Sequence, residues 1–183
     1  MLARELRISK PFANVLVNRG IRDVNSAQRF LNPQLRQLAD PLALPDMRLA
    51  VERILAAIEK KHQIIIYGDY DVDGVTSSAL LFRVLRAAGA RVENFLPHRM
   101  DEGYGLTTDG VARCLKEHNP ELLVAVDCGT SSCNEIADLA ERGIDTIVLD
   151  HHEPPAELPE CVALVNPKRT PKGEPLASVG ATS

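Results

Sequence analysis

The stretch that most constrains this chain is IIIYGDYDVDGVT, residues Ile64–Thr76. A short apolar run that favours a β-strand leads into Asp69, Asp71 and Asp73, spaced two residues apart, and then into Gly74. Neighbouring carboxylates repel one another and raise each other's pKa, so a buried strand ending in three of them is costly to fold without a cation. Side chains two apart on a strand share a face, and they can surround a common centre where the strand becomes a turn. The pattern therefore predicts a divalent metal site, with Gly74 permitting a tight path into the following helix.

Two other protein classes share parts of this motif. The spacing D-x-D-x-D-G also begins a calcium-binding EF-hand loop, but that loop needs a glutamate at its twelfth position, which here is Leu80, and a helix before it. The EF-hand is therefore excluded. The string DVDGV is similar to the motif of haloacid-dehalogenase phosphatases, although their nucleophilic aspartate usually follows the strand directly. These residues alone leave that second alternative open.

Apolar runs alternate with helical patterns from Asp46 onward. Near-continuous apolar strands between helices indicate an α/β fold, with a mostly parallel sheet sandwiched by helices. The expected strands are residues 64–67, 92–96, 122–126, 144–149 and 161–165, and the expected helices are 46–58 (capped by Asp46), 75–88, 108–118 and 134–142. Before them, Ser9 and Pro11 begin one short helix and residues 25–31 form another. We therefore predict a helical N-terminal segment at residues 1–45 and an α/β domain at residues 46–183.

The predicted strands deliver polar residues to one edge of the sheet. Ligands of open parallel sheets bind outside the carboxyl ends of the strands. At those ends lie Asp69, Asp71, Asp73, His98, Arg99, Asp127, Asp150, His151 and His152. Carboxylates with imidazoles suit Mn²⁺ or Mg²⁺, and an aspartate on a central strand such as Asp127 can bridge two ions about 3.5–4 Å apart. With Arg99 and His152 holding phosphate oxygens, these residues predict metal-dependent hydrolysis of a phosphoester.

Composition and charge agree with a cytosolic globular protein. The apolar fraction is 45%, the first residues lack the apolar core of a signal peptide, and no apolar run is long enough for a membrane span. The four cysteines form no C-x-x-C pair, so we expect reduced thiols and a cytoplasmic location. Residues 1–38 carry seven Arg or Lys against two Asp or Glu, whereas residues 39–165 carry eleven against twenty-two. An acidic centre of this kind needs divalent cations before a phosphate can approach.

The strings GDYDVDG, DCGTSS and DHH resemble the first three motifs of the DHH phosphoesterase superfamily. The longer strings IYGDYDVDGVTS, FLPHRMDEGYGL, VAVDCGTS and VLDHHEPP, together with VNRGI, FLNP and DPLALPDM near the N-terminus, resemble the RecJ family of bacterial exonucleases within it. This resemblance spans essentially the whole chain, and it sets aside the dehalogenase alternative, because that family has no DHH strand end. It implies a 5′→3′ exonuclease on single-stranded DNA that releases mononucleotides in recombination and repair.

The resemblance also implies roles for individual residues. Asp71 would ligate one Mn²⁺ or Mg²⁺ and Asp73 the other, with Asp127 bridging the two ions and His151 joining the metal of Asp73. Asp69 is a further candidate ligand. The residues expected around these ligands are Asp150, which orients the histidine pair, His98, Arg99 and His152, which hold the substrate phosphate, and Tyr104, which stacks on a base.

By the same resemblance, the partners are single-stranded DNA with a 5′ end, a single-stranded-DNA-binding protein and a RecQ-type helicase, with no membrane involved. Members of the RecJ family continue beyond the motif at which this sequence ends, through a further metal-binding aspartate and two more domains. We therefore expect these 183 residues alone to bind metal weakly and to degrade DNA poorly. The alternatives are a phosphodiesterase acting on cyclic dinucleotides or short oligonucleotides, and a non-catalytic remnant of the fold.

Overall fold

The structure is a computed structural model that describes residues 1–98 and 103–170. It divides into two compact units, residues 1–40 and residues 41–183, each formed by contacts among its own residues. Within the described residues, no helix combines the length and the apolar character needed to cross a bilayer.

The first unit is a small group of helices. Its elements are α1 (Leu2–Glu5), α2 (Lys10–Asn18), α3 (Val24–Leu31) and the 3-10 turn η1 (Leu35–Gln37). Ser9 caps α2 and Asp23 caps α3, each by accepting a hydrogen bond from a backbone N–H three residues later. The core of the unit consists of Leu2, Ala13, Leu16 and Ala27, all buried. The predicted helix that begins at Ser9 is thus present.

The second unit is a five-stranded sheet in the order β2-β1-β3-β4-β5, and every neighbouring pair is parallel. This arrangement confirms the predicted α/β class. After η2 (Pro41–Ala43), its elements in chain order are α4 (Met47–Glu59), β1 (Gln63–Gly68), α5 (Val72–Ala87), β2 (Arg91–Phe95), α6 (Thr108–Glu117), β3 (Leu122–Val126), α7 (Cys133–Glu141), β4 (Asp145–Leu149), β5 (Ala163–Val165) and η3 (Pro167–Arg169).

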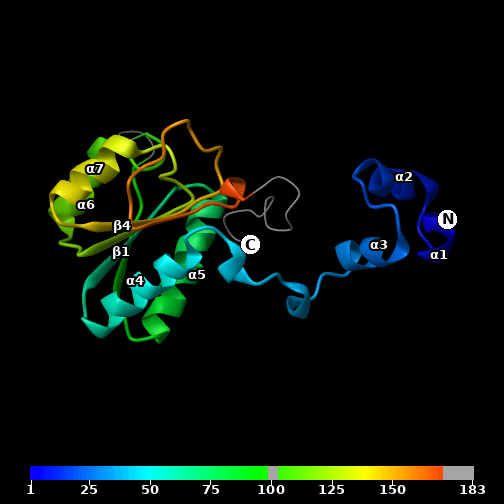
Figure 1. Cartoon of the computed structure of the whole chain (residues 1–183), viewed down its shortest axis with the longest axis horizontal. Helices are drawn as coiled ribbons and strands as arrows, with labels where there is room; N and C mark the ends of the chain where they lie inside the picture. The colour runs from blue at the N-terminus through cyan, green and yellow to red at the C-terminus, as the bar shows by residue number, and fades with distance from the viewer. Residues whose placement is uncertain (99–102, 171–183) are drawn as a thin grey trace. The chain divides into compact units, whose positions relative to one another are not determined.

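Helices cover both faces of this sheet, with α6 and α7 on one side and α4 and α5 on the other (Figure 1). Alternate side chains of β1 divide between the two layers. Ile65 and Tyr67 pack with α6 and α7, whereas Ile64 and Ile66 pack against the α4 and α5 layer. All four are fully buried, and each buried aliphatic side chain stabilises the fold by about 1.5–3 kcal/mol.

Two local expectations were wrong. The helix after the first motif begins at Val72, three residues before the predicted start, because Asp71 itself caps it. Asp46 stands at the N-cap position of α4, but its backbone is left-handed (φ 56°) and its side chain makes no capping hydrogen bond. The Asp46 carboxylate instead accepts from the backbone N–H of Leu164 at 3.3 Å and pairs with Arg169 at 2.5 Å. It therefore ties the start of α4 to β5, a long-range contact that no local pattern predicts.

Candidate metal centre

The carboxyl edge of the sheet is built around Asp127, which directly follows β3. Its backbone is left-handed (φ 63°), a conformation that aspartate tolerates better than most residues, and its N–H donates to the carbonyl of Leu149 at 2.9 Å. Only 1% of Asp127 is exposed. The turn therefore holds a nearly buried carboxylate at the end of a central strand.

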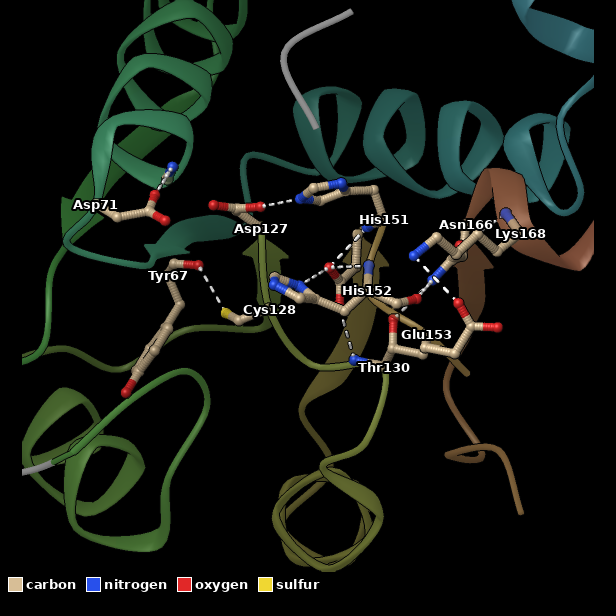
Figure 2. Close-up of polar contacts among 12 residues, drawn as sticks. Tyr67, Asp71, Asp127, Cys128, Thr130, His151, His152, Glu153, Asn166 and Lys168 are labelled. Atoms are coloured by element: carbon tan, nitrogen blue, oxygen red, sulfur yellow. Dashed lines mark hydrogen bonds and ion pairs between the residues drawn. The ribbon is translucent and has the colours of Figure 1, made fainter. Parts of the chain in front are cut away.

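Asp127 faces a pair of histidines at the end of β4. Nε2 of His151 lies 3.1 Å from Oδ1 of Asp127, and Figure 2 shows Asp127 between Asp71 and His151. One ligand atom from each of Asp127, His151 and His152 lies within 4.8 Å of the others, a spacing that can hold a metal ion. An imidazole and carboxylate grouping of this kind suits first-row divalent cations.

Asp150 organises the histidine pair through its buried carboxylate. Its Oδ1 accepts from the backbone N–H groups of His151 (2.7 Å) and His152 (3.1 Å) and lies 2.7 Å from Nδ1 of His152. Its Oδ2 accepts from the backbone N–H of Thr130 at 3.0 Å. Burial would raise the pKa of Asp150, but the hydrogen bonds from Thr130 and His152 outweigh it and hold the pKa below its ordinary value. Asp150 thereby fixes the orientation of the His152 ring.

The same contact acts on His152. Partial burial tends to lower the pKa of this imidazole, but the hydrogen bond and the charge of Asp150 prevail, so its pKa is raised. The raised pKa favours the protonated ring, which can donate to a phosphate oxygen.

The three aspartates of the first motif occupy different positions. Asp69 is nearly buried, and its Oδ1 accepts from the backbone N–H of Tyr70 at 2.7 Å. Asp71 is exposed and caps α5 by accepting from the backbone N–H of Gly74 at 2.9 Å, which lowers its pKa. Asp73 lies in the first turn of α5. Among the described residues, the group that has metal-ligand spacing does not include these three, and of them Asp71 interacts with Asp127.

Burial and the carboxylate of Asp71 together raise the pKa of Asp127 to about 7. Two acidic groups this close interact unfavourably when both are ionised, and a divalent cation between them would relieve that repulsion. Oδ1 of Asp127 is buried and, apart from the nearby imidazole of His151, has no hydrogen-bond partner among the described residues. A buried oxygen in this position fits a metal ligand.

Gly74 has a different role from the one expected. It lies inside α5 at an ordinary helical φ, and a Cβ there would stand 2.3 Å from the carbonyl oxygen of Asp69. Glycine thus lets the first turn of the helix press against the backbone that follows β1. This close approach positions Asp69 and Asp71 at the carboxyl edge.

An open cavity of about 260 Å³ lies beside these groups. The described residues that line it are Asp69, Tyr104, Gly105, Leu106, Asp127, Cys128, Gly129, Thr130, Ser131, Ser132, Asp150 and His152. Tyr104 is 70% exposed, and its ring centroid lies 5.1 Å from that of Tyr70. The thiol of Cys128 is packed against the cavity, where burial keeps its pKa well above the ordinary value. The cavity therefore combines acidic groups with an aromatic side.

Two contributors were missed from the sequence. Tyr70 stands between the aspartates of the first motif and pairs with Tyr104. Asn166 is fully buried after β5, where its Nδ2 donates to Oγ1 of Thr130 (3.0 Å) and to the carbonyl of His152 (2.9 Å). Its position at the end of the last strand, before a proline, is the sequence feature that could have indicated a role at this edge of the sheet.

The remaining predicted substrate residues are placed less fully. His98 is exposed after β2 and is not among the described residues that line the cavity. Arg99 lies outside the described residues.

Comparisons with known proteins identify the family that this chain resembles. A model of the DHH family, N-terminal domain, matches residues 63–183. The chain is 39% identical over 168 residues to the single-stranded-DNA-specific exonuclease RecJ of Bacillus subtilis, covering 92% of this chain and 21% of that protein. A crystal structure of exonuclease RecJ bound to manganese matches with a TM-score of 0.68 and 37% identity, over 75% of this chain and 35% of that one. RecJ of Thermus thermophilus in complex with Mn²⁺ matches with a TM-score of 0.71 and 31% identity, over 93% of this chain and 23% of that one.

The chain thus spans about a fifth of the Bacillus subtilis relative and about a third or less of the two solved chains. The family match covers more than half of the 183 residues and includes the ends of β1, β3 and β4, where the acidic and imidazole groups meet. The chain therefore belongs to the DHH family.

Proposed function

We propose that this chain carries the metal-binding half of a phosphodiesterase site, and that it acts on single-stranded DNA from the 5′ end, releasing mononucleotides. The observation that carries the proposal is the meeting of Asp127 with His151 and His152 at the carboxyl edge, beside Asp71. The sequence similarity to RecJ exonucleases supports the choice of substrate.

Two divalent cations, Mn²⁺ or Mg²⁺, would bind at this site. Asp71 and Asp73 would each hold one ion, Asp127 would lie between them and His151 would complete the second, with Asp69 as a further ligand. The buried carboxylate of Asp127 next to Asp71 is a donor pair that needs positive charge. When bound, such ions activate a water molecule near neutral pH and stabilise the attacking and leaving oxygens at phosphorus.

The chain's other residues would bind and orient the substrate. Asp150 holds the ring of His152 so that Nε2 is free to donate to a phosphate oxygen, and Arg99 and His98 would hold further phosphate oxygens. The paired rings of Tyr70 and Tyr104 offer a surface on which a base can stack. Such stacking tolerates every base, as a sequence-independent nuclease requires.

The domain boundary, the cell location and the partners belong to the same proposal. A helical segment at residues 1–45 precedes a DHH domain at residues 46–183, in a cytoplasmic protein of DNA recombination and repair. A single-stranded-DNA-binding protein and a RecQ-type helicase would deliver the substrate. Similarity to the RecJ exonucleases supports these assignments.

The test measures Mn²⁺ binding and product release by the purified chain together. Calorimetry gives the Mn²⁺ affinity, and 5′-labelled and 3′-labelled single strands show which end is released first. We expect Asp127→Asn to abolish both Mn²⁺ binding and any release of 5′ mononucleotides. Cleavage that persists unchanged in Asp127→Asn contradicts the proposal, and a preference for cyclic dinucleotides over a series of longer strands would identify the other DHH-type activity.

A further inference from the structure

The N-terminal unit contains a second cavity, far along the sequence from the metal centre. It is an open groove of about 790 Å³. Its described lining consists of five carboxamides and one guanidinium, from Asn25, Gln28, Arg29, Asn32, Gln34 and Gln37. All six residues belong to the unit of residues 1–40, so the groove is a feature of that unit alone.

Helix α3 and its C-cap supply four of the six positions from one face. Asn25, Gln28, Arg29 and Asn32 follow one another at intervals of three, one and three residues, which places them along one side of the helix. The opposite face carries Ala27, fully buried in the core of the unit. The turn η1 closes the groove, with the side chain of Gln37 accepting from the backbone N–H of Gln34 at 3.2 Å.

The side chains that line this groove suit a ligand that offers both hydrogen-bond donors and acceptors. A solvated helix face ordinarily carries lysine and glutamate, whereas a carboxamide both donates and accepts hydrogen bonds without a charge. Unpaired nucleobases present the same mixture of donors and acceptors on their edges, and asparagine and glutamine pair with such edges. The guanidinium of Arg29 can in addition pair with a phosphate through two parallel hydrogen bonds.

The charge of the unit agrees with an anionic ligand. Residues 1–40 carry seven Arg or Lys against three Asp or Glu, whereas residues 41–183 carry fourteen against twenty-two. A polyanion is therefore attracted to the first unit and repelled by the average field of the second.

We propose that the groove of α3 and η1 binds a single-stranded nucleic acid segment, with its carboxamides on the base edges and Arg29 on a phosphate. The choice of ligand class rests on the proposed function, but the site is separate from the metal centre and needs no cation. A single strand is the ligand because a duplex has the Watson–Crick edges of its bases already paired, whereas a single strand also exposes those edges.

The test is fluorescence anisotropy of a labelled 12-nucleotide single strand with the whole 183-residue chain, in excess EDTA so that no hydrolysis occurs. We expect Arg29→Gln to weaken binding about 3- to 10-fold and to reduce the slope of log affinity against log salt by about 0.7, the loss of one phosphate contact. The double variant Gln28→Ala/Asn32→Ala should weaken binding by a similar factor without changing that slope. Both changes lie on exposed residues, and circular dichroism verifies that the helices remain.

Lys10→Ala is the matched control, because Lys10 is exposed in the same unit and carries the same charge but does not line the groove. It should weaken binding less than twofold. An equal effect of Lys10→Ala and Arg29→Gln, or equal affinity for single and double strands, would overturn the proposal and leave only diffuse charge attraction. Mn²⁺ affinity is measured on the same variants without EDTA, so that failure of the groove and failure of the hydrolytic site give different results.

Discussion

Asp127 combines three properties that single residues seldom share: a left-handed backbone, almost complete burial and a carboxylate beside another carboxylate. Its position after a central strand was predictable from the apolar run that precedes it. The backbone conformation was not, because it depends on the hydrogen bond to Leu149 in the neighbouring strand end. The hydrogen bond from Thr130 to Asp150 and the contact of Asp46 with Leu164 escaped prediction for a similar reason, since each joins segments distant in sequence.

The raised pKa of Asp127 predicts how stability depends on pH when no metal is bound. Because the pKa is 3.8 in the unfolded chain and about 7 in the folded one, the folded state holds the extra proton between these values. The contribution of Asp127 to the free energy of unfolding therefore falls as pH rises from about 4 to about 7, partly offset by Asp71, whose pKa is lowered in the folded state. Asp127→Asn should remove this dependence and raise the melting temperature at pH 8 in EDTA.

The comparison is made by thermal unfolding from about pH 4 to about pH 8, with and without Mn²⁺. The original chain should gain melting temperature on adding Mn²⁺, as any ligand of the folded state produces, and Asp127→Asn should not. Glu160→Gln, the same exchange at an exposed position, should behave like the original chain. The prediction would be wrong if Asp127→Asn melted at a lower temperature than the original chain at pH 8 in EDTA. Such a result would show that the ionised carboxylate of Asp127 does not destabilise the folded state.

At the scale of elements, α5 brings the first motif to the carboxyl edge. Apolar spacing predicted the existence of the helix, but its start depended on whether Asp71 would bind metal only or also cap the helix. Cap and candidate ligand are the same carboxylate here. The first turn can stand this close to Asp69 only because Gly74 has no side chain.

Gly74→Ala should therefore destabilise the protein, although alanine favours helices by about 1 kcal/mol over glycine. The added Cβ would overlap the backbone of Asp69, which is less able to move than a flexible side chain. We expect a loss of about 2 kcal/mol or more in the free energy of unfolding, measured by urea denaturation, together with weaker Mn²⁺ binding.

The opposite exchange in the same helix calibrates this result. Ala79 is exposed in the middle of α5, and Ala79→Gly should lower the free energy of unfolding by only about 1 kcal/mol with no effect on Mn²⁺ binding. If Gly74→Ala proved as stable as the original chain, the close contact between the helix and Asp69 would be refuted.

At the scale of the whole molecule, each hydrophobic cluster of the described residues lies within one of the two units. The two clusters around the sheet consist of residues beyond position 41, and the third cluster lies wholly within residues 1–40. The strand and helix order was predictable because alternating apolar runs leave few parallel topologies. The groove on α3 was not, because carboxamides carry no periodic signal and the turn that closes the groove lies outside the helix.

Separate cores predict separate folding. A chain of residues 41–183 should keep a cooperative thermal transition and its stabilisation by Mn²⁺, because both clusters of the sheet are retained. It should lose the binding of single strands in EDTA. Melting curves and Mn²⁺ titrations of the two chains test this, and a loss of the cooperative transition on removing residues 1–40 would contradict it.

The left-handed turn at Asp127 also limits the paths by which this protein can evolve. Glycine and asparagine suit that backbone but bring no negative charge, whereas glutamate brings the charge at a cost of about 1–2 kcal/mol in backbone strain. Aspartate alone satisfies both demands. We therefore expect selection to remove substitutions at position 127 even where the sequences of the neighbouring loops change. A designer seeking a different metal preference should for this reason vary His151, whose backbone carries no such restriction, and leave position 127 unchanged.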